Sequence, residues 1–241
     1  MGMLDKTKLI GVELKKHLPF TLLGAATGIV FMLAGRQWFS NQAETLFSVF
    51  HPLHVLLSAM VTAALFEIHR KVKSFLLILI IGIVGSIGVA TLSDCVLPYF
   101  GESILGAAIP THAALHEHAD GQLCEEHHAK LHLGFVEEWY LVFPAAIIGV
   151  LLAYFKPTTH LPHASHVLLS TWASSAHILM NTHADMTTTL LLGMFIVLFL
   201  AVWLPCCASD IVFPLLFVGP DGKHESHTCV FCRKKGAKNE S

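Results

Sequence analysis

A short histidine-rich sequence occurs twice in the chain. The stretch from His51 to Ser58 reads HPLHVLLS, and it returns from His163 to Ser170 as HASHVLLS, with six of eight positions identical. Residues three and four apart share one face of a helix, so each copy presents two imidazoles and a hydroxyl group as a polar stripe. Imidazole nitrogen binds Zn²⁺ and other divalent transition metals, so each copy predicts part of a metal site.

An aspartate follows each copy at a similar distance. The segment SDCVLP begins at Ser93 and the segment SDIVFP begins at Ser209, with four of six positions identical. A carboxylate inside a membrane is costly and usually functional, which predicts a site of two histidines and one aspartate in each half. The predicted ligands are His51, His54 and Asp94 in the first half and His163, His166 and Asp210 in the second, whose polar stripe His177 extends.

Two further segments hold side chains that bind metals. The C-terminal tail carries His224, His227, Cys229 and Cys232 in close spacing, which supplies the four ligands of a tetrahedral Zn²⁺ site. The segment 101–137 is acidic and rich in histidine, but it lacks a fixed spacing, which favours weak metal collection over a rigid site. Solvated, unstructured segments without bound metal are the alternative for both.

The repeated histidines also fit roles that involve no bound Zn²⁺. Polar residues that only join helices, or that cap helices at the membrane interface, give the same pattern. Axial haem ligation by His54, His166 or His177 is a third interpretation, and it requires two histidines at matching depth on facing helices. The predicted topology places His54 and His166 near opposite membrane faces, which argues against that pair.

The elements that carry these residues are predicted to cross a membrane. Hydrophobic residues make up 54% of the chain and charged residues 13%, whereas a soluble domain has about 25% charged residues. A spanning helix needs about 20 mostly apolar residues. Six segments qualify, namely 18–35, 46–67, 75–99, 138–156, 163–181 and 187–206. No basic patch with interleaved aromatic residues is present, so nucleic-acid binding is not expected.

The basic residues orient these six spans. If the N-terminus lies inside, every Lys and Arg except Arg36 and Lys130 falls on the inner side, as the positive-inside rule requires. Three spans per repeat force the two halves into opposite orientations, as in many secondary transporters. The predicted fold is an all-α polytopic membrane protein whose six transmembrane helices form two inverted-topology three-helix repeats.

This plan divides the chain into five parts. They are a basic cytoplasmic segment 1–17, a first three-helix repeat 18–100, an extracytoplasmic His-rich acidic loop 101–137, a second three-helix repeat 138–218 and a cytoplasmic His/Cys tail 219–241. The expected location is a plasma or inner membrane, with both termini cytoplasmic and the helices in contact with the lipid bilayer. One histidine–aspartate site is then expected near each membrane face. A homodimer is a reasonable assembly for so thin a bundle.

The sequence therefore predicts a transporter and not an enzyme. The predicted substrate is a divalent transition-metal ion, Zn²⁺ first and Fe²⁺, Mn²⁺, Co²⁺ or Ni²⁺ as alternatives, because His and Asp ligands suit all of them. Alternating access between the two inverted repeats is the expected mechanism, and proton coupling is an option because histidine titrates near neutral pH. The alternatives are a membrane-embedded metalloenzyme and a metal-binding sensor or accessory subunit.

Overall fold

A computed structural model describes residues 3–38, 42–69, 74–107, 131–156, 160–182 and 186–207, and these residues form helices and no strand. The elements are α1 (Met3–Trp38), α2 (Ala43–His69), α3 (Phe75–Thr91), the π-helical turn η2 (Leu92–Val96), α4 (Leu97–Ile104), α5 (Gly134–Glu137), α6 (Trp139–Phe155), α7 (His160–Asn181) and α8 (Thr188–Cys207). The first predicted segment, 1–17, is helical from Met3 onward and continuous with α1.

Four of the helices are long and apolar enough to cross a membrane. They cover Leu18–Gly35, Ala43–Glu67, Phe75–Ile104 and Thr188–Cys206. Their lengths match the roughly 20 residues that a bilayer core requires, so the fold is consistent with a multi-pass membrane protein in contact with lipid. The other two predicted spans, 138–156 and 163–181, correspond to α6 and α7. Helix α6 is apolar but has only 17 residues, so the number six stays a prediction.

The third predicted span ends too early. Helices α3 and α4, joined by η2, form one helical column that continues to Ile104, so residues 101–104 belong to a helix and not to the predicted loop. Pro98 stands two residues after η2, and because proline has no N–H to donate to the preceding turn, its position fits an interruption of the helical hydrogen bonding there. This extension brings Glu102 into the helix bundle.

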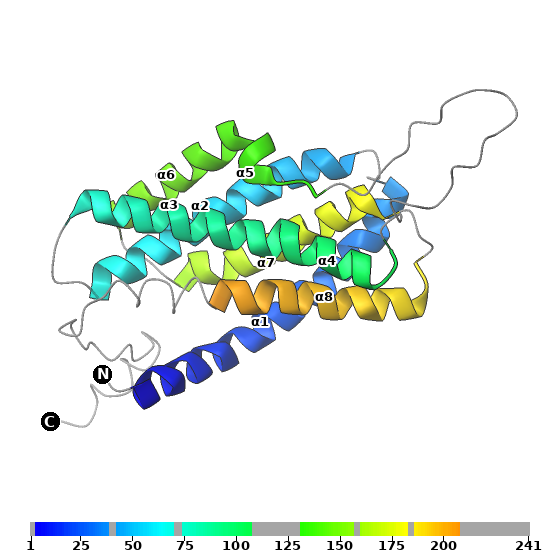
Figure 1. Ribbon diagram of the computed structural model, residues 1–241, viewed down its shortest axis with the longest axis horizontal. Coiled ribbons are helices and arrows are strands. Elements are labelled where there is room, and N and C mark those ends of the chain that lie inside the picture. The colour runs from blue at the N-terminus through cyan, green and yellow to red at the C-terminus, as the bar shows by residue number, and fades with distance from the viewer. Residues whose placement is uncertain are drawn as a thin grey trace, which may run out of the picture.

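The long helices lie side by side and alternate in direction. In Figure 1, α1, the α3–α4 column and α7 run one way, while α2, α6 and α8 run the other way. Helix α2 packs against α3, α6 and α7, and α1 packs against α7 and α8. The buried apolar core between α2, α3 and α6 contains Ala59, Ala63, Phe66, Ile78 and Val150. Helix α2 is thus the central element, and α7 is enclosed by its neighbours.

Small residues allow these helices to approach closely. A methyl group on Gly149 of α6 would overlap the Leu56 carbonyl oxygen of α2 and lie 2.9 Å from the Ala59 Cβ. A methyl group on Gly24 of α1 would lie 2.7 Å from Thr171 Oγ1 of α7. Glycine at helix crossings is typical of membrane bundles, where packing replaces the hydrophobic drive between helices.

Candidate functional site

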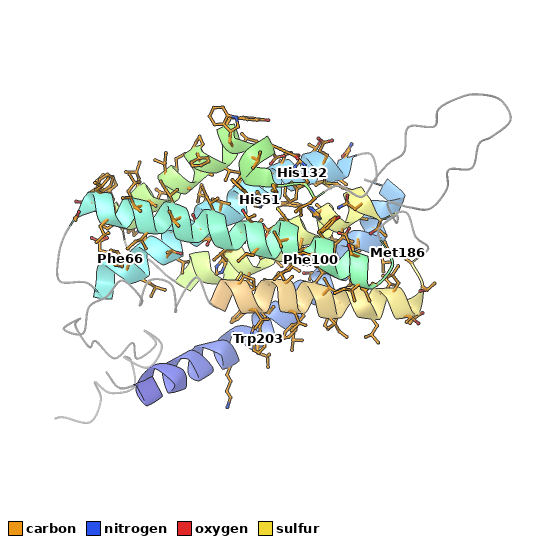
Figure 2. The ribbon with its side chains drawn as sticks, in the orientation of Figure 1. His51, Phe66, Phe100, His132, Met186 and Trp203 are labelled. Atoms are coloured by element: carbon orange, nitrogen blue, oxygen red, sulfur yellow. The ribbon has the colours of Figure 1, made fainter. Side chains whose placement is uncertain are left out.

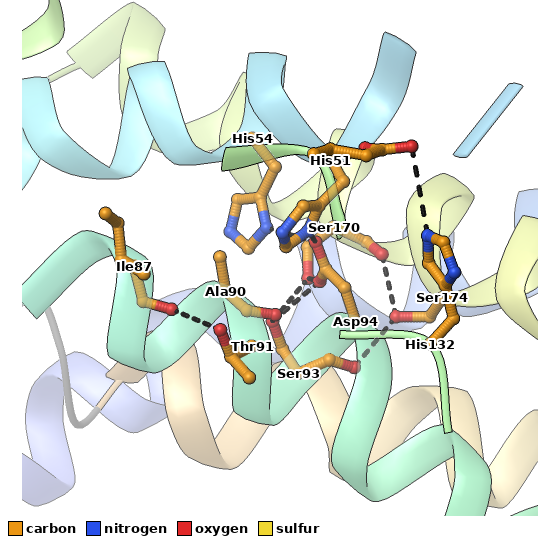
Figure 3. Close-up of polar contacts among 11 residues, drawn as sticks. His51, His54, Ile87, Ala90, Thr91, Ser93, Asp94, His132, Ser170 and Ser174 are labelled. Carbon is orange, nitrogen blue, oxygen red and sulfur yellow. Dashed lines mark hydrogen bonds and ion pairs between the residues drawn. The ribbon is translucent and has the colours of Figure 1, made fainter. Parts of the chain in front are cut away.

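Asp94 is the centre of the polar interior. His51 Nδ1 lies 2.9 Å and His54 Nδ1 lies 2.7 Å from the same carboxylate oxygen, Asp94 Oδ2, as Figure 3 shows. All three side chains are fully buried. The two histidines are three residues apart on α2, so one helix face presents both rings to η2. The predicted first-half set therefore comes together in space.

The other oxygen of Asp94 is bound by serines from both halves of the chain. Ser93 Oγ donates to Asp94 Oδ1 at 2.6 Å, and Ser170 Oγ of α7 donates to it at 2.8 Å. The carboxylate thus accepts four hydrogen bonds, which fills the roughly four lone-pair positions that it offers. In this arrangement Asp94 joins α2, η2 and α7, and both of its oxygens are engaged in orienting other side chains.

The π-helical turn sets the position of Asp94. Leu92–Val96 interrupt the regular α-helical hydrogen bonding of the α3–α4 column. Such single π-turns are frequent at functional sites because they expose backbone groups and re-aim side chains. Ser174 Oγ of α7 donates to the backbone carbonyl oxygen of Ser93 at 2.9 Å, so the second half of the chain supports the turn that carries the aspartate.

The hydrogen bonds to Asp94 determine which ring nitrogen of each histidine is engaged and which one remains without a partner. A carboxylate only accepts, so Nδ1 of His51 and of His54 carries a hydrogen, and in the neutral form of each ring Nε2 carries the lone pair. Both Nε2 atoms are buried, and neither has a hydrogen-bond partner among the described residues. Histidines that bind metals characteristically donate their other N–H to a carboxylate. With both imidazoles in the neutral form, the carboxylate is a buried negative charge, which a cation would neutralise.

His166 joins this group, contrary to the prediction that the two histidine pairs lie near opposite membrane faces. Its ring stacks on His54, with centroids 5.8 Å apart and an angle of 7° between the planes. Because α2 and α7 pack against each other, a histidine in the seventh position of α7 meets one in the twelfth position of α2. The two rings meet face to face, whereas an iron between them would need both Nε2 edges, which argues against haem ligation by this pair.

A second buried pair involves His177, which was also predicted as a ligand. His177 Nδ1 lies 3.5 Å from Glu102 Oε1 of α4 and 3.5 Å from Asn181 Nδ2. His177 and Glu102 are both fully buried. Sequence reasoning missed Glu102 because it placed the residue in a loop. Its separation of eight residues from Asp94 was the available signal, since two helical turns place both carboxyl groups near one face.

A short segment, Leu131–Glu138, covers the His51 side of the site, and we call it the strap. Figure 2 shows His132 of the strap beside His51. Phe47 stacks on His51 at 5.0 Å and meets the His132 ring edge-on at 5.0 Å. His132 forms an ion pair with Glu137, and its Nε2 lies 3.8 Å from Glu138 Oε1. The strap thus contributes one imidazole and two carboxyl groups next to the buried site.

Glu138, the residue before α6, fastens the end of the strap to α2. It accepts a hydrogen bond from Ser48 Oγ and is only 5% exposed. Burial alone would raise the pKa of this carboxyl, but the nearby His132 imidazole, the hydrogen bond from Ser48 and the His51 imidazole together outweigh it and hold the pKa below its usual range. Glu138 is therefore an anion at neutral pH, and the contact with Ser48 is a charge-assisted hydrogen bond.

The remaining predicted ligands are not placed. His163 is part of α7, but its side chain lies outside the described residues, as do Asp210, His224, His227, Cys229 and Cys232 and the segment 108–130 of the predicted loop. Within the described ranges, no group of three or more His, Cys, Asp or Glu side chains is arranged to hold a metal ion. The predicted ligand sets of the second half and of the tail stay predictions.

In comparisons with protein-family models, with curated proteins and with solved structures, the chain shows no match.

Proposed function

We propose that this protein is an integral membrane transporter of a divalent transition-metal cation, with Zn²⁺ as the first candidate. The observation that carries the proposal is that two histidines donate Nδ1–H to one buried carboxylate and keep two buried Nε2 atoms without a hydrogen-bond partner among the described residues. In the proposed bound state, His51 and His54 bind the ion through Nε2. Asp94 acts as the positioning carboxylate and not as a ligand, because its lone pairs are already engaged.

The charge balance favours a cation as the substrate. The Asp94 cluster holds one carboxylate and no Lys or Arg among its described hydrogen-bond partners. A neutral solute would leave that charge unbalanced in a medium of low polarity, whereas Zn²⁺ would compensate it. Imidazole nitrogen is a preferred ligand of Zn²⁺, and an exchangeable ion keeps water at its open coordination positions. His166, stacked on His54, is a further imidazole beside the pair.

The arrangement of the helices supports transport. We propose that α6 and α7 complete a set of six spans, with α7 tolerating its polar residues because α1, α2 and α8 enclose it. Three helices with alternating directions then form each half, and the second half runs opposite to the first. The Asp94 cluster lies where α2 and η2 of the first half meet α7 of the second. Secondary transporters bind their substrates at such repeat interfaces.

The proposed site lies between the two halves of the chain. The Ser170–Asp94 hydrogen bond connects the two halves directly. In the proposed cycle, the halves rock about this contact and expose the histidine pair first to one side and then to the other, as in alternating access.

A membrane-embedded metalloenzyme is the second candidate. The contact between His54 and His166 favours it, because enzymes of this kind collect their histidines in one place. A metalloenzyme retains its ion during turnover, whereas a transporter releases it. Metal flux therefore separates the two functions.

The test is Zn²⁺ flux into sealed proteoliposomes, measured with a zinc-sensitive dye in the lumen. We expect flux with the wild-type protein and at least about tenfold less with Asp94→Asn, the loss expected when the carboxylate behind a metal-binding histidine is removed. Glu44→Gln is the matched control, because Glu44 is an exposed carboxylate in the first turn of α2. Equal flux in wild-type and empty liposomes would overturn the proposal. Tight Zn²⁺ binding without flux would support the metalloenzyme or the sensor instead.

A further inference from the structure

The strap lies directly on the edge of His51 that carries Nε2. A methyl group built on Gly134 would lie 2.6 Å from His51 Nε2, closer still to Cδ2 of the same ring, and 3.3 Å from Phe47 Cε1. These distances show that the Gly134 backbone touches the His51 ring, so a side chain at this position has no room. The atom that we assign to the ion is therefore covered by strap backbone.

Three contacts hold the strap in place. The backbone N–H of Gly134 lies near the thiol of Cys95 in η2. Ser48 of α2 donates to Glu138. Leu131 and Leu133 pack against the buried cluster that contains Phe47 and Cys95. These contacts connect the strap to α2 and to η2, the two elements that carry His51 and Asp94.

The strap is short compared with the helices around it, with eight residues from Leu131 to Glu138. Its only helix, α5, has four residues and no side-chain cap at its N-terminus. The hydrogen bond between Ser48 and Glu138 joins its charged end to α2. A short segment with a single helical turn opens at a lower free-energy cost than long packed helices.

We propose that the strap, Leu131–Glu138, is the gate that closes the His51–His54–Asp94 site from the α5 end of the bundle. Gly134 is the point where it seats on His51, and the Ser48–Glu138 hydrogen bond is its latch. The purpose of the gate rests on the proposed function, because only a transported ion needs one. The contacts that define the gate do not depend on that function.

Cys95 supplies a reporter for strap opening. Its thiol is fully buried and lies near Gly134, with Leu131 and Leu133 packed against the same cluster, so a reagent reaches it from this end only when the strap lifts. The experiment uses the full chain with Cys124, Cys206, Cys207, Cys229 and Cys232 replaced by serine. The rate at which a polar maleimide labels Cys95 is then measured on the detergent-purified protein.

Two variants are designed to open the gate, and one serves as control. Ser48→Ala removes the latch, and Gly134→Ala places a methyl group against His51. Gly88→Ala is matched to the second variant, because the space around Gly88 is open on α3. We expect Ser48→Ala to label at least about tenfold faster than the parent, the factor that follows from losing one hydrogen bond to a charged group. We expect a similar increase for Gly134→Ala, because the added methyl group overlaps the His51 ring and pushes the strap away from it. Gly88→Ala should label at the parent rate.

The labelling results test the gate independently of Zn²⁺ transport. Parent-like labelling in both Ser48→Ala and Gly134→Ala, with unchanged melting temperatures, would overturn the gate even if Zn²⁺ flux is observed. Equally fast labelling in Gly88→Ala would also overturn it, because the effect would then reflect general loosening of the bundle. Fast labelling in the two strap variants supports the gate whether or not the liposomes transport Zn²⁺.

Discussion

Replacing Asp94 by asparagine tests the role of the carboxylate with the smallest change of shape. The amide can keep its oxygen toward the two histidine N–H groups and turn its NH₂ toward Ser93 and Ser170, whose hydroxyl oxygens can accept. Two charge-assisted hydrogen bonds, from His51 at 2.9 Å and from His54 at 2.7 Å, then become neutral ones. Each such change costs about 1 kcal/mol, so the histidine pair loses about 2 kcal/mol of support.

A loss of that size corresponds to roughly thirtyfold weaker Zn²⁺ binding, within the 10- to 100-fold range expected for an outer-sphere partner. The assay is a Zn²⁺ titration of detergent-purified protein with a competing chelator. His224, His227, Cys229 and Cys232 are replaced beforehand so that the tail does not contribute. The reasoning is refuted if Asp94→Asn binds Zn²⁺ within about twofold of the parent, or if the exposed control Glu44→Gln loses as much affinity.

Three further predictions follow from individual contacts. Ser170→Ala removes one of the four hydrogen bonds to Asp94 and should weaken Zn²⁺ binding less than Asp94→Asn does, by about tenfold or less in the same titration; a larger loss than Asp94→Asn would contradict it. Gly149→Ala forces a methyl group onto the α2 backbone and should lower stability by about 1–3 kcal/mol in thermal unfolding, whereas Gly88→Ala should not destabilise. His177→Ala removes the buried imidazole beside Glu102 and should lower the free energy of unfolding by about 1–3 kcal/mol, because the buried carboxyl group loses its polar neighbour; adding Glu102→Leu should recover much of that loss, and a strictly additive double variant would show that the pair does not interact.

The repeat and the hydropathy of the chain predicted much of the site. Spacing on a helix predicts that His51 and His54 share a face, and their duplication with an aspartate singles out Asp94. These three side chains are in contact in the structure. The direction of the imidazoles could not be predicted in this way. Which histidine nitrogen faces the carboxylate depends on the packing of α2 against η2. Because Nδ1 of both rings faces Asp94, we propose that Asp94 orients the histidines and does not itself bind the ion.

The main error of the sequence-based prediction was the depth of the histidines in the helix bundle. The predicted order of the spans placed His54 and His166 near opposite membrane faces. In the structure, their positions within α2 and α7 bring the two ring centroids to 5.8 Å from each other. Crossing helices set relative depth, and hydropathy alone does not report where they cross. The strap escaped prediction for a different reason. Gly134 and His132 were assigned to the predicted loop 101–137, and their approach to His51 and Phe47 is a tertiary contact.

The central claim is that His51 and His54 bind a divalent cation through Nε2. It is tested most directly by anomalous scattering at the zinc absorption edge from crystals grown with Zn²⁺. The account predicts an anomalous peak about 2.0–2.1 Å from Nε2 of both histidines, with Asp94 still bonded to both Nδ1 atoms. A protein whose Zn²⁺ ions all lie elsewhere, with the Nε2 atoms of His51 and His54 unliganded at saturating Zn²⁺, would contradict it.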